Sequence, residues 1–400
     1  MKDLGKITVF NSALIWFGAA VSIAEILTGS LIAPLGFSKG VAAIVIGHVI
    51  GCIPLYLAGL VGAKSGKSAM ETVKISFGQK GSIFFSVLNV TQLVGWTAVM
   101  IIAGGRAVAI VAERYTGMYS PAFWCLVIGL LIMVWVVVGI KNLEKVNVFT
   151  MTALFTLTVL LSFIVFGGDS STGASGVMSF GSAVELSAAM PLSWLPLISD
   201  YTHNSSSPRR TALISVLVYF AVSTWMYMIG LGASIFTGET DIAKIMMGAG
   251  LGIAAVFIIV VSTVTTTFLD VYSAGISFSS VTNMVSSKTT AFIACIAGTA
   301  IAVFTPIEQY ENFLFLIGSV FAPMISILIV DFFILKKDHF QESINLSNFV
   351  LWAIGFAMYR ACMQVETPLG NTLPVMVALI VFATVVGKIR KEDKNVCSDN

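Results

Sequence analysis

Residues 181–200, GSAVELSAAMPLSWLPLISD, have the length and composition of a membrane-spanning segment but contain two prolines, Pro191 and Pro196. A spanning helix needs about 20 mainly apolar residues. Each proline removes an amide donor and clashes with a preceding carbonyl, so a continuous helix is not expected here. Broken backbone at membrane depth is tolerated only where it is buried in protein or lines a cavity. The segment therefore predicts a membrane protein with an interrupted helix near its functional centre.

The composition of the whole chain supports a membrane location. Of its 400 residues, 57% are hydrophobic and 10% are charged, whereas soluble domains are about 45–50% apolar and about 25% charged. A soluble protein with so few charges would lack the polar groups that cover its surface. Together with residues 181–200, eleven further segments predict an all-α integral membrane protein of about twelve transmembrane helices: 10–35, 41–62, 82–107, 121–140, 147–167, 211–236, 249–283, 289–305, 310–335, 347–364 and 372–389.

The charges in the connecting loops predict an orientation. Cytoplasmic loops carry an excess of lysine and arginine. With Lys2 and Lys6 in the cytoplasm, the cationic loops at 64–80 and 209–210 fall on the same side. An even number of helices then places both termini in the cytoplasm, in a protein of the cell (inner) membrane. The net charge of +2 is spread over the loops, so nucleic acid is not expected as a partner, and no obligatory protein partner is inferred.

A second weak point lies in the first helix, where small and polar residues run from Gly18 to Gly29. It precedes the interrupted segment by five helices. Corresponding broken helices in two halves indicate the binding site of an inverted-repeat transporter. We therefore expect a first repeat at 1–167, a second at 168–338, and two accessory helices with a cytoplasmic tail at 339–400. A proline kink beside an unrelated glycine-rich packing face would produce the same pattern.

Ionisable residues inside spanning segments are costly and usually mark a pathway or a site. Glu25 lies midway along the first helix and Asp270 lies at depth in the eighth. A carboxyl that is satisfied by a neighbouring hydroxyl in helix packing is the alternative. Asp200 and Asp331 fall at predicted cytoplasmic helix ends, where we expect salt bridges or caps.

Two further helices carry polar faces. Gln92 and Trp96 are one turn apart on the third helix, so an indole and an amide share a face that suits a planar heterocycle; interhelical packing is the alternative. On the eighth helix, the hydroxyls of Ser262, Thr265 and Thr266 lie on one side. With carbonyls freed by a broken first helix they would form an all-oxygen shell for a hard cation, here sodium. Threonines that bond to their own backbone are the alternative.

The sequence lacks the patterns that are typical of membrane enzymes and of channels. His48, His203 and His339 are far apart and have no H-E-x-x-H spacing, and there is no glycine-rich phosphate loop. Nothing resembles the polar ring or repeated filter of a channel. The protein is therefore expected to be neither an enzyme nor a channel.

Short motifs with a shared pattern lie along nearly the whole chain: Thr91–Trp96, Ile46–Gly47, Gly62–Gly66, Ser76–Gly78, Lys80–Ser82, Thr265–Thr266, Tyr272–Gly275, Ser286–Thr289, Ala322–Pro323 and Ile329–Phe332. Together these motifs resemble the nucleobase:cation symporter family, in particular its cytosine permease branch. Within that branch, residues 22–29 and 265–275 are most similar to hydroxymethylpyrimidine transporters, which are grouped with thiamine-precursor salvage.

The resemblance implies a five-plus-five inverted-repeat fold with two accessory helices, and alternating access around a midplane site. It implies a Na+ site between helices one and eight, with side-chain ligands from Thr265 and Thr266 and a polar group at Ser262. Carbonyls near Phe17 and Ala20 would complete that site. Substrate would lie among the following residues of helices three, six and eight: Gln92, Trp96, Ser193, Trp194 and the segment that holds Asp270.

The chain departs from cytosine permeases at two positions. It reads Thr267-Phe268-Leu269-Asp270 where they carry an asparagine-rich stretch, and it has Glu25 where they have an uncharged residue. Both changes place an acidic residue near the expected pocket. We therefore interpret Glu25 as the residue that recognises the ring-nitrogen and amine edge of an aminopyrimidine by hydrogen bonds. The substrate is expected to be a pyrimidine such as hydroxymethylpyrimidine or cytosine, with Na+ as the coupling ion and no organic cofactor. Since burial favours the neutral form of a carboxyl, a proton carried by Glu25 is the alternative coupling ion.

Overall fold

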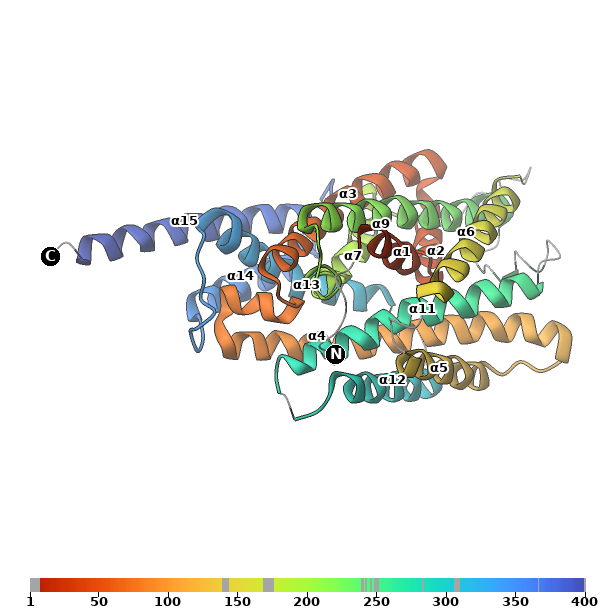
Figure 1. The fold of residues 1–400 in the computed structure, drawn as a ribbon. Coiled ribbons are helices and arrows are strands. Elements are labelled where there is room, and N and C mark those ends of the chain that lie inside the picture. Colours follow the sequence, from red (N-terminus) through yellow and green to blue (C-terminus); the bar gives the residue numbers. More distant parts are fainter. Residues whose placement is uncertain are drawn as a thin grey trace.

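The structure is a computed structural model that describes residues 8–138, 144–167, 176–238, 241, 243–244, 247, 252–282, 284–305, 310–365 and 367–398. Lys2 and Lys6, on which the predicted orientation depends in part, lie outside these residues. The chain folds into helices that run roughly along one common direction (Figure 1). In order, the helices are α1 (Val9–Ala20), α2 (Ile23–Leu31), η1 (Ala33–Leu35), α3 (Phe37–Ser65), α4 (Ala69–Thr116), α5 (Pro121–Val138), α6 (Glu144–Phe166), α7 (Phe180–Ser193), α8 (Ile198–Thr202), α9 (Pro208–Gly232), η3 (Ala233–Thr237), α11 (Gly252–Ser279), α12 (Ser287–Phe304), α13 (Tyr310–Ile329), η4 (Val330–Leu335), α14 (Leu346–Cys362) and α15 (Thr372–Ser398).

The membrane-spanning helices follow the predicted segments closely. Within the described residues, nine helices are individually long and apolar enough to cross a bilayer, and there are ten if the bent pair α1–α2 counts as one span. The two remaining predicted segments correspond to the interrupted pair α7–α8 and to α14, which has 17 residues. The all-helical membrane fold that the sequence predicts is therefore confirmed.

Two groups of helices pack against each other. In the first, which we call the bundle, α3 packs along α7 and α9, and α1 and α2 pack along α9. In the second, which we call the scaffold, α4, α5, α11 and α12 pack together. Helices α1 and α2 also touch α11 and α4 of the scaffold, so the broken first helix lies where the two groups meet.

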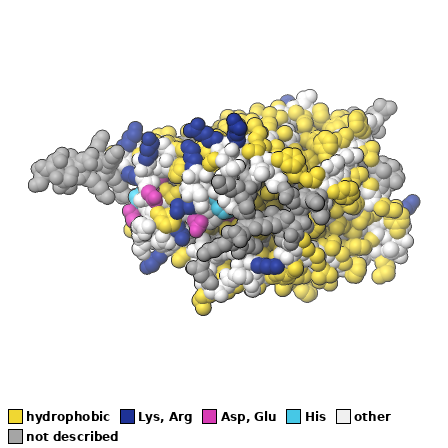
Figure 2. All heavy atoms as spheres, in the orientation of Figure 1, with side chains coloured by type: hydrophobic (Ala, Val, Ile, Leu, Met, Phe, Trp, Pro, Cys, Tyr) yellow, Lys and Arg dark blue, Asp and Glu magenta, His cyan; other side chains and the backbone are white. Residues whose placement is uncertain are grey.

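The last helices form a separate layer. Helices α13, α14 and α15 pack on one another, and α13 also contacts α7. Helix α15 projects from one end of the molecule towards the C-terminus (Figure 1). Most of the lysine and arginine side chains in view gather at that end, while hydrophobic side chains cover the rest of the visible body (Figure 2). Exposed apolar residues such as Phe149, Phe155 and Phe163 are explained by lipid as the outer solvent.

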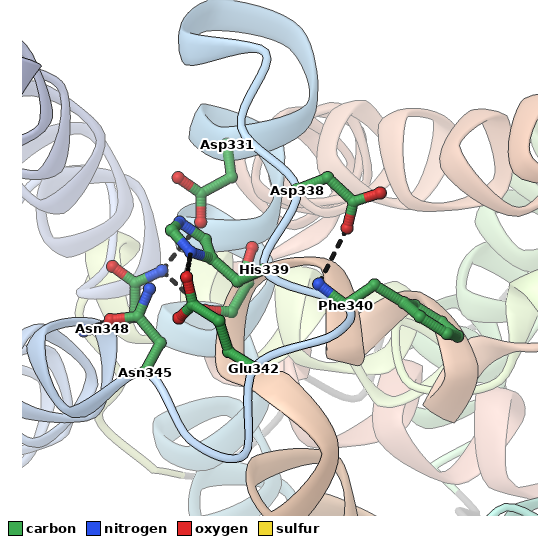
Figure 3. A network of polar contacts seen from close by, with 8 residues as sticks. Asp331, Asp338, His339, Phe340, Glu342, Asn345 and Asn348 are labelled. Carbon is green, nitrogen blue, oxygen red and sulfur yellow. Dashed lines mark hydrogen bonds and ion pairs between the residues drawn. The ribbon is translucent and has the colours of Figure 1, made fainter.

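Helix α4 has a sharp break at Gly78, where φ is +74° and a side chain would be strained. The segment that joins η4 to α14 packs into this break. Backbone N–H groups of Gln79 and Lys80 donate to the carbonyls of Glu342 and Ser343, at 2.9 and 2.8 Å. The segment itself is held by polar contacts, including one between His339 Nδ1 and Glu342 Oε1 at 2.8 Å (Figure 3).

The two acids that were predicted at helix ends have structural partners. Asp200 Oδ1 accepts a hydrogen bond from the N–H of Ala69 at 2.8 Å, so it caps the first turn of α4. Asp331 Oδ2 accepts a hydrogen bond from Asn348 Nδ2 at 2.8 Å (Figure 3). Its partner is thus an amide on α14 rather than the expected cation or helix end.

Candidate functional site

The first helix is broken at the predicted position. Helices α1 and α2 meet at an angle of 51° across Val21 and Ser22. Ser22 Oγ accepts a hydrogen bond from the N–H of Glu25 at 3.3 Å and caps α2. Glu25 therefore sits in the first turn of α2, where the positive end of the helix dipole favours negative charge.

The second break also lies where the prolines predict it. Helix α7 ends at Ser193 and α8 begins at Ile198, with a turn over the residues between them. The carbonyl of Pro196 in this turn accepts a hydrogen bond from Asn89 Nδ2 of α4 at 3.0 Å. A polar side chain of the scaffold thus satisfies backbone that the break leaves without a helical partner.

Both breaks open onto one cavity between the bundle and the scaffold. Its volume is about 20 Å³, which is room for about one water molecule. The lining brings together Glu25 from α2, Trp96 from α4, Thr266 and Asp270 from α11, and Ser193 and Trp194 from the second break. Five of the six predicted substrate residues therefore surround the same space.

Gln92, the sixth predicted residue, lies one turn from Trp96 but does not line this cavity. It is buried, and its Nε2 donates to Asn89 Oδ1 at 2.7 Å. Its Oε1 has no hydrogen-bond partner among the described residues. The amide is thus held by Asn89 beside the second break, with one buried acceptor unused.

The carboxyl of Glu25 is deeply buried and hydrogen-bonded. Tyr219 donates its hydroxyl to Oε1 at 2.9 Å, and Ser223 Oγ lies 2.9 Å from Oε2. Behind Ser223, the imidazole Nε2 of His48 lies 2.6 Å from the same Oγ. The carboxyl therefore faces the cavity in front and a polar network of the bundle behind.

Asp270 lines the cavity from α11, and its surroundings differ from those of Glu25. Its side chain is 5% exposed and makes no hydrogen bond with any of the described residues. An acid that is buried without a partner is costly, so its open side is a position where a ligand donor would be stabilising.

Aromatic rings fix the position of Trp194. Its ring centroid lies 5.4 Å from that of Trp16, in an edge-to-face arrangement, and 6.2 Å from that of Tyr219. On the scaffold side, Trp96 packs edge-on against Phe313 at 5.6 Å. The cavity is thus bordered by two indoles whose orientation is set by neighbouring rings.

The predicted cation residues lie where α1 meets α11. Thr266 Oγ1 donates to the carbonyl of Gly18 at 3.1 Å, which joins the two helices directly. Thr265 donates to the carbonyls of Val261 and Ser262, at 2.9 and 3.1 Å, and Ser262 donates to the carbonyl of Ile259 at 3.3 Å. Hydroxyl oxygens keep lone pairs when they donate, so these bonds leave them able to bind a cation.

The two predicted carbonyl ligands of α1 accept hydrogen bonds at the break. The Phe17 carbonyl accepts from the N–H of Val21 at 3.0 Å, and that of Ala20 accepts from the N–H of Ser22 at 3.1 Å. The carbonyl that the structure brings to the helix-eight hydroxyls is that of Gly18, one residue from the predicted Phe17. The donor set is all oxygen, which fits a hard cation.

Comparison with known proteins decides the family. Residues 6–387 match the family model described as a permease for cytosine/purines, uracil, thiamine and allantoin. The chain belongs to this permease family. The permease is 27% identical to the cytosine permease of Escherichia coli (strain K12) over 363 residues, which cover 87% of this chain and 82% of the relative. It is 22% identical to the hydantoin permease of Microbacterium maritypicum over 362 residues, which cover 82% and 73%.

Solved structures show the same fold. The permease superposes on the inward-facing conformation of Mhp1 with a TM-score of 0.80 at 18% sequence identity, over 97% of this chain and 92% of Mhp1. A closed conformation of Mhp1 with bromovinylhydantoin bound gives a TM-score of 0.79 at 18% identity, over 96% and 91% of the two chains. A Na+-coupled sialic acid symporter gives 0.71 at 14% identity, over 96% and 90%. The permease therefore has the fold of these transporters, and its relatives are permeases rather than enzymes.

Sequence reasoning missed several residues at the site of the permease. His48, Tyr219 and Ser223 surround the rear of Glu25, and Trp16 supports Trp194. A histidine inside an otherwise apolar segment was the available signal for His48, but its isolation from other polar residues in the sequence concealed its partners. Those partners come from helices that are adjacent only after folding.

Proposed function

We propose that the permease is a cation-coupled symporter that imports a pyrimidine-type compound, such as hydroxymethylpyrimidine or cytosine, with Na+ as the coupling ion. The observation that carries this proposal is the single cavity at both helix breaks. It combines the indoles of Trp96 and Trp194 with the carboxyls of Glu25 and Asp270. Indoles stack on a planar ring, and carboxyls bind its donor groups.

The two acids favour a substrate with an exocyclic amine. An aminopyrimidine presents an amine beside a ring nitrogen, and a carboxyl oxygen accepts from that amine through a lone pair that its other hydrogen bonds leave available. Glu25, which lines the cavity from α2, is the proposed partner of this amine. Asp270, which is buried and lacks a hydrogen-bond partner among the described residues, is the proposed acceptor for a second donor of the ring or its hydroxymethyl group.

For the ion, the support is the contact between α1 and α11. Thr266 already bonds to the carbonyl of Gly18 at 3.1 Å. On the same helix, Thr265 is the preceding residue and Ser262 lies one turn away. The carbonyls of Phe17 and Ala20 are close in sequence to this contact. One structural neighbour is a Na+-coupled symporter, which supports sodium as the proposed coupling ion.

The transport cycle follows from the two breaks. We assign residues 1–167 and 168–338 to two repeats and 339–400 to an accessory unit with a cytoplasmic tail. A cavity of about 20 Å³ is smaller than a pyrimidine ring, so the bundle must move relative to the scaffold to admit substrate. The charged end of the molecule then faces the cytoplasm, with both termini there, in the cell (inner) membrane. A role in thiamine-precursor salvage follows if the substrate is hydroxymethylpyrimidine.

Uptake into proteoliposomes tests the proposal. We expect saturable accumulation of radiolabelled hydroxymethylpyrimidine or cytosine under an inward Na+ gradient, and a loss of at least about ten-fold when choline replaces Na+. Thr266→Val removes one proposed oxygen ligand and should raise the half-saturating Na+ concentration by about ten-fold. Thr263→Val is the matched control, because this hydroxyl points at Gly104 instead. Absence of uptake for every pyrimidine tested would refute the proposed substrate class.

Proton coupling through Glu25 is the second candidate. The hydrogen bonds of this carboxyl to Tyr219 and Ser223, with His48 behind them, favour it. The same vesicles separate the two candidates. Uptake that persists in choline and follows an imposed proton gradient would assign coupling to Glu25, and the hydroxyls of α11 would then serve helix packing.

A further inference from the structure

A line of buried polar side chains leads from the cavity into the bundle. It begins at Glu25 on α2 and continues through Ser223 on α9 and His48 on α3 to Ser187 on α7. Successive atoms are 2.9 Å apart between Glu25 Oε2 and Ser223 Oγ, 2.6 Å between that Oγ and His48 Nε2, and 2.7 Å between His48 Nδ1 and Ser187 Oγ. All four side chains are almost completely buried. Side chains that are buried to this degree satisfy their hydrogen-bonding groups mainly through one another.

The surroundings of His48 Nδ1 decide which ring nitrogen carries hydrogen. The carbonyl of Ile44, which only accepts, lies 3.0 Å from Nδ1. The Ser187 hydroxyl donates its hydrogen to the same carbonyl, at 2.7 Å. Its oxygen therefore also acts as an acceptor towards Nδ1. Both neighbours of Nδ1 are acceptors, and Nδ1 is therefore the protonated nitrogen. In a neutral imidazole, Nε2 is then an acceptor.

The contacts on the Nε2 side of the His48 ring need one more hydrogen than Ser223 supplies. The two contacts of Ser223, to Nε2 and to Oε2, need two hydrogens, and the hydroxyl supplies one. The second hydrogen resides on Glu25 Oε2 or on His48 Nε2. A carboxylate together with a neutral Nδ1–H imidazole would leave two acceptors facing a single hydroxyl hydrogen.

We propose that Glu25, Ser223 and His48 form one proton-binding unit, which holds a single exchangeable proton between the cavity and the interior of the bundle. This inference deepens the proton-coupled candidate and rests on the proposed function only in giving the proton a transport role. The Glu25 carboxyl is the end of the unit that substrate reaches. His48 is a positioning residue, because it acts on the cavity only through Ser223.

Transfer within the unit moves two hydrogens and changes no other bond. The Oε2–H bond of Glu25 breaks as that hydrogen joins Ser223 Oγ, and the original Oγ–H bond breaks as its hydrogen joins His48 Nε2. The neutral acid and neutral imidazole become a carboxylate and an imidazolium, and the total number of protons stays the same. When the proton leaves the unit altogether, the imidazole has to exchange its Nδ1–H for an Nε2–H so that Ser223 can donate to the carboxylate.

Other titratable groups border the unit. Tyr219 of α9 donates to Glu25 Oε1, and the Tyr227 ring of the same helix packs edge-on against the His48 ring at 4.8 Å. Cys52 of α3 lies within electrostatic range of Glu25, and Asp270 of α11 shares the cavity with it. Among the described residues, no lysine or arginine forms a hydrogen bond or ion pair with Glu25 or His48. The proton of the unit therefore has no fixed cation to replace it.

Spectroscopy of the full-length permease in liposomes, without substrate, tests the unit. Ring-nitrogen NMR of 15N-histidine-labelled protein reports the His48 state, and the chain has only 3 histidines to assign. Infrared difference spectra report the protonated carboxyl band of Glu25, which Glu25→Gln identifies. We expect the band and the His48 signals to change with one common midpoint as pH is varied. Separate midpoints in the wild-type protein would overturn the proposal.

Two variants complete the test. Ser223→Ala severs the link and should separate the two midpoints by at least about one pH unit. Ser215→Ala, on the same helix but hydrogen-bonded to Ser12, should leave them coincident. Coincident midpoints in Ser223→Ala would overturn the unit.

Glu25→Gln keeps the test valid if the Ser223 variant fails to fold. Its amide N–H donates to Ser223 as the acid does, so His48 should keep the Nδ1–H tautomer over the pH range in which the Glu25 band changes in the wild-type protein. A His48 signal that still changes with the wild-type midpoint in Glu25→Gln would contradict the proposal. Because no substrate is present, these results stand or fall independently of the uptake assays.

Discussion

At the scale of single residues, Glu25 carries most of the proposed recognition. It is 1% exposed, borders the cavity and holds the hydroxyls of Tyr219 and Ser223. Glu25→Ala removes the pairing group and leaves buried hydroxyls unsatisfied, at a cost of about 1–3 kcal/mol. We expect the affinity for hydroxymethylpyrimidine to fall by at least about ten-fold, measured by equilibrium binding to purified permease. Glu113→Ala, at an exposed position of α4, is the control, and equal affinities in the two variants would show that Glu25 does not touch the substrate.

At the scale of secondary-structure elements, the position of Glu25 depends on how closely α2 approaches α9. A Cβ at Gly230 would lie 1.9 Å from the carbonyl oxygen of Ile26, and one at Gly29 would lie 2.1 Å from that of Tyr227. Gly230→Ala should force the helices apart, lower the stability by about 1–3 kcal/mol and weaken the Glu25 contacts, which thermal unfolding and substrate binding measure together. In Gly59→Ala the new Cβ meets side-chain atoms rather than backbone, the nearest being the flexible end of Ile198 at 3.0 Å, and this variant should cause a smaller change. Equal losses in the two variants would contradict this account of the α2–α9 contact.

At the scale of the whole molecule, Glu185 ties the accessory helices to the bundle. This buried carboxyl of α7 accepts hydrogen bonds from Tyr359 of α14 and Thr372 of α15, and from the N–H of Asn371 at 2.6 Å. Glu185→Gln turns one acceptor into a donor that faces donors, so we expect a loss of about 1–3 kcal/mol and faster proteolysis between α14 and α15. Glu311→Gln is the matched control, since Glu311 borders the same hollow of about 310 Å³ but is exposed. Unchanged stability in Glu185→Gln would show that α14 and α15 are held in other ways.

Local chemistry made much of the architecture predictable. Apolar length sets where a helix spans, and two prolines or a run of small residues set where it breaks. For this reason the predicted breaks at residues 18–29 and 191–196 agree with the ends of α1, α2, α7 and α8. Acids at depth are costly wherever the chain places them, so Glu25 and Asp270 were recognisable as site candidates without a structure.

The surroundings of those acids were decided only by the tertiary structure. His48 and Ser223 are 175 residues apart, and Glu25 and Ser223 are 198 apart. A hydrogen bond depends on distances of about 3 Å, which spacing along the chain does not specify across separate helices. The sequence alone thus determined a helical membrane permease with two broken helices and acids near its centre. Packing of α2, α3, α7 and α9 decided which partners hold Glu25, that Gln92 lies off the cavity, and that the carbonyl of Gly18 meets Thr266.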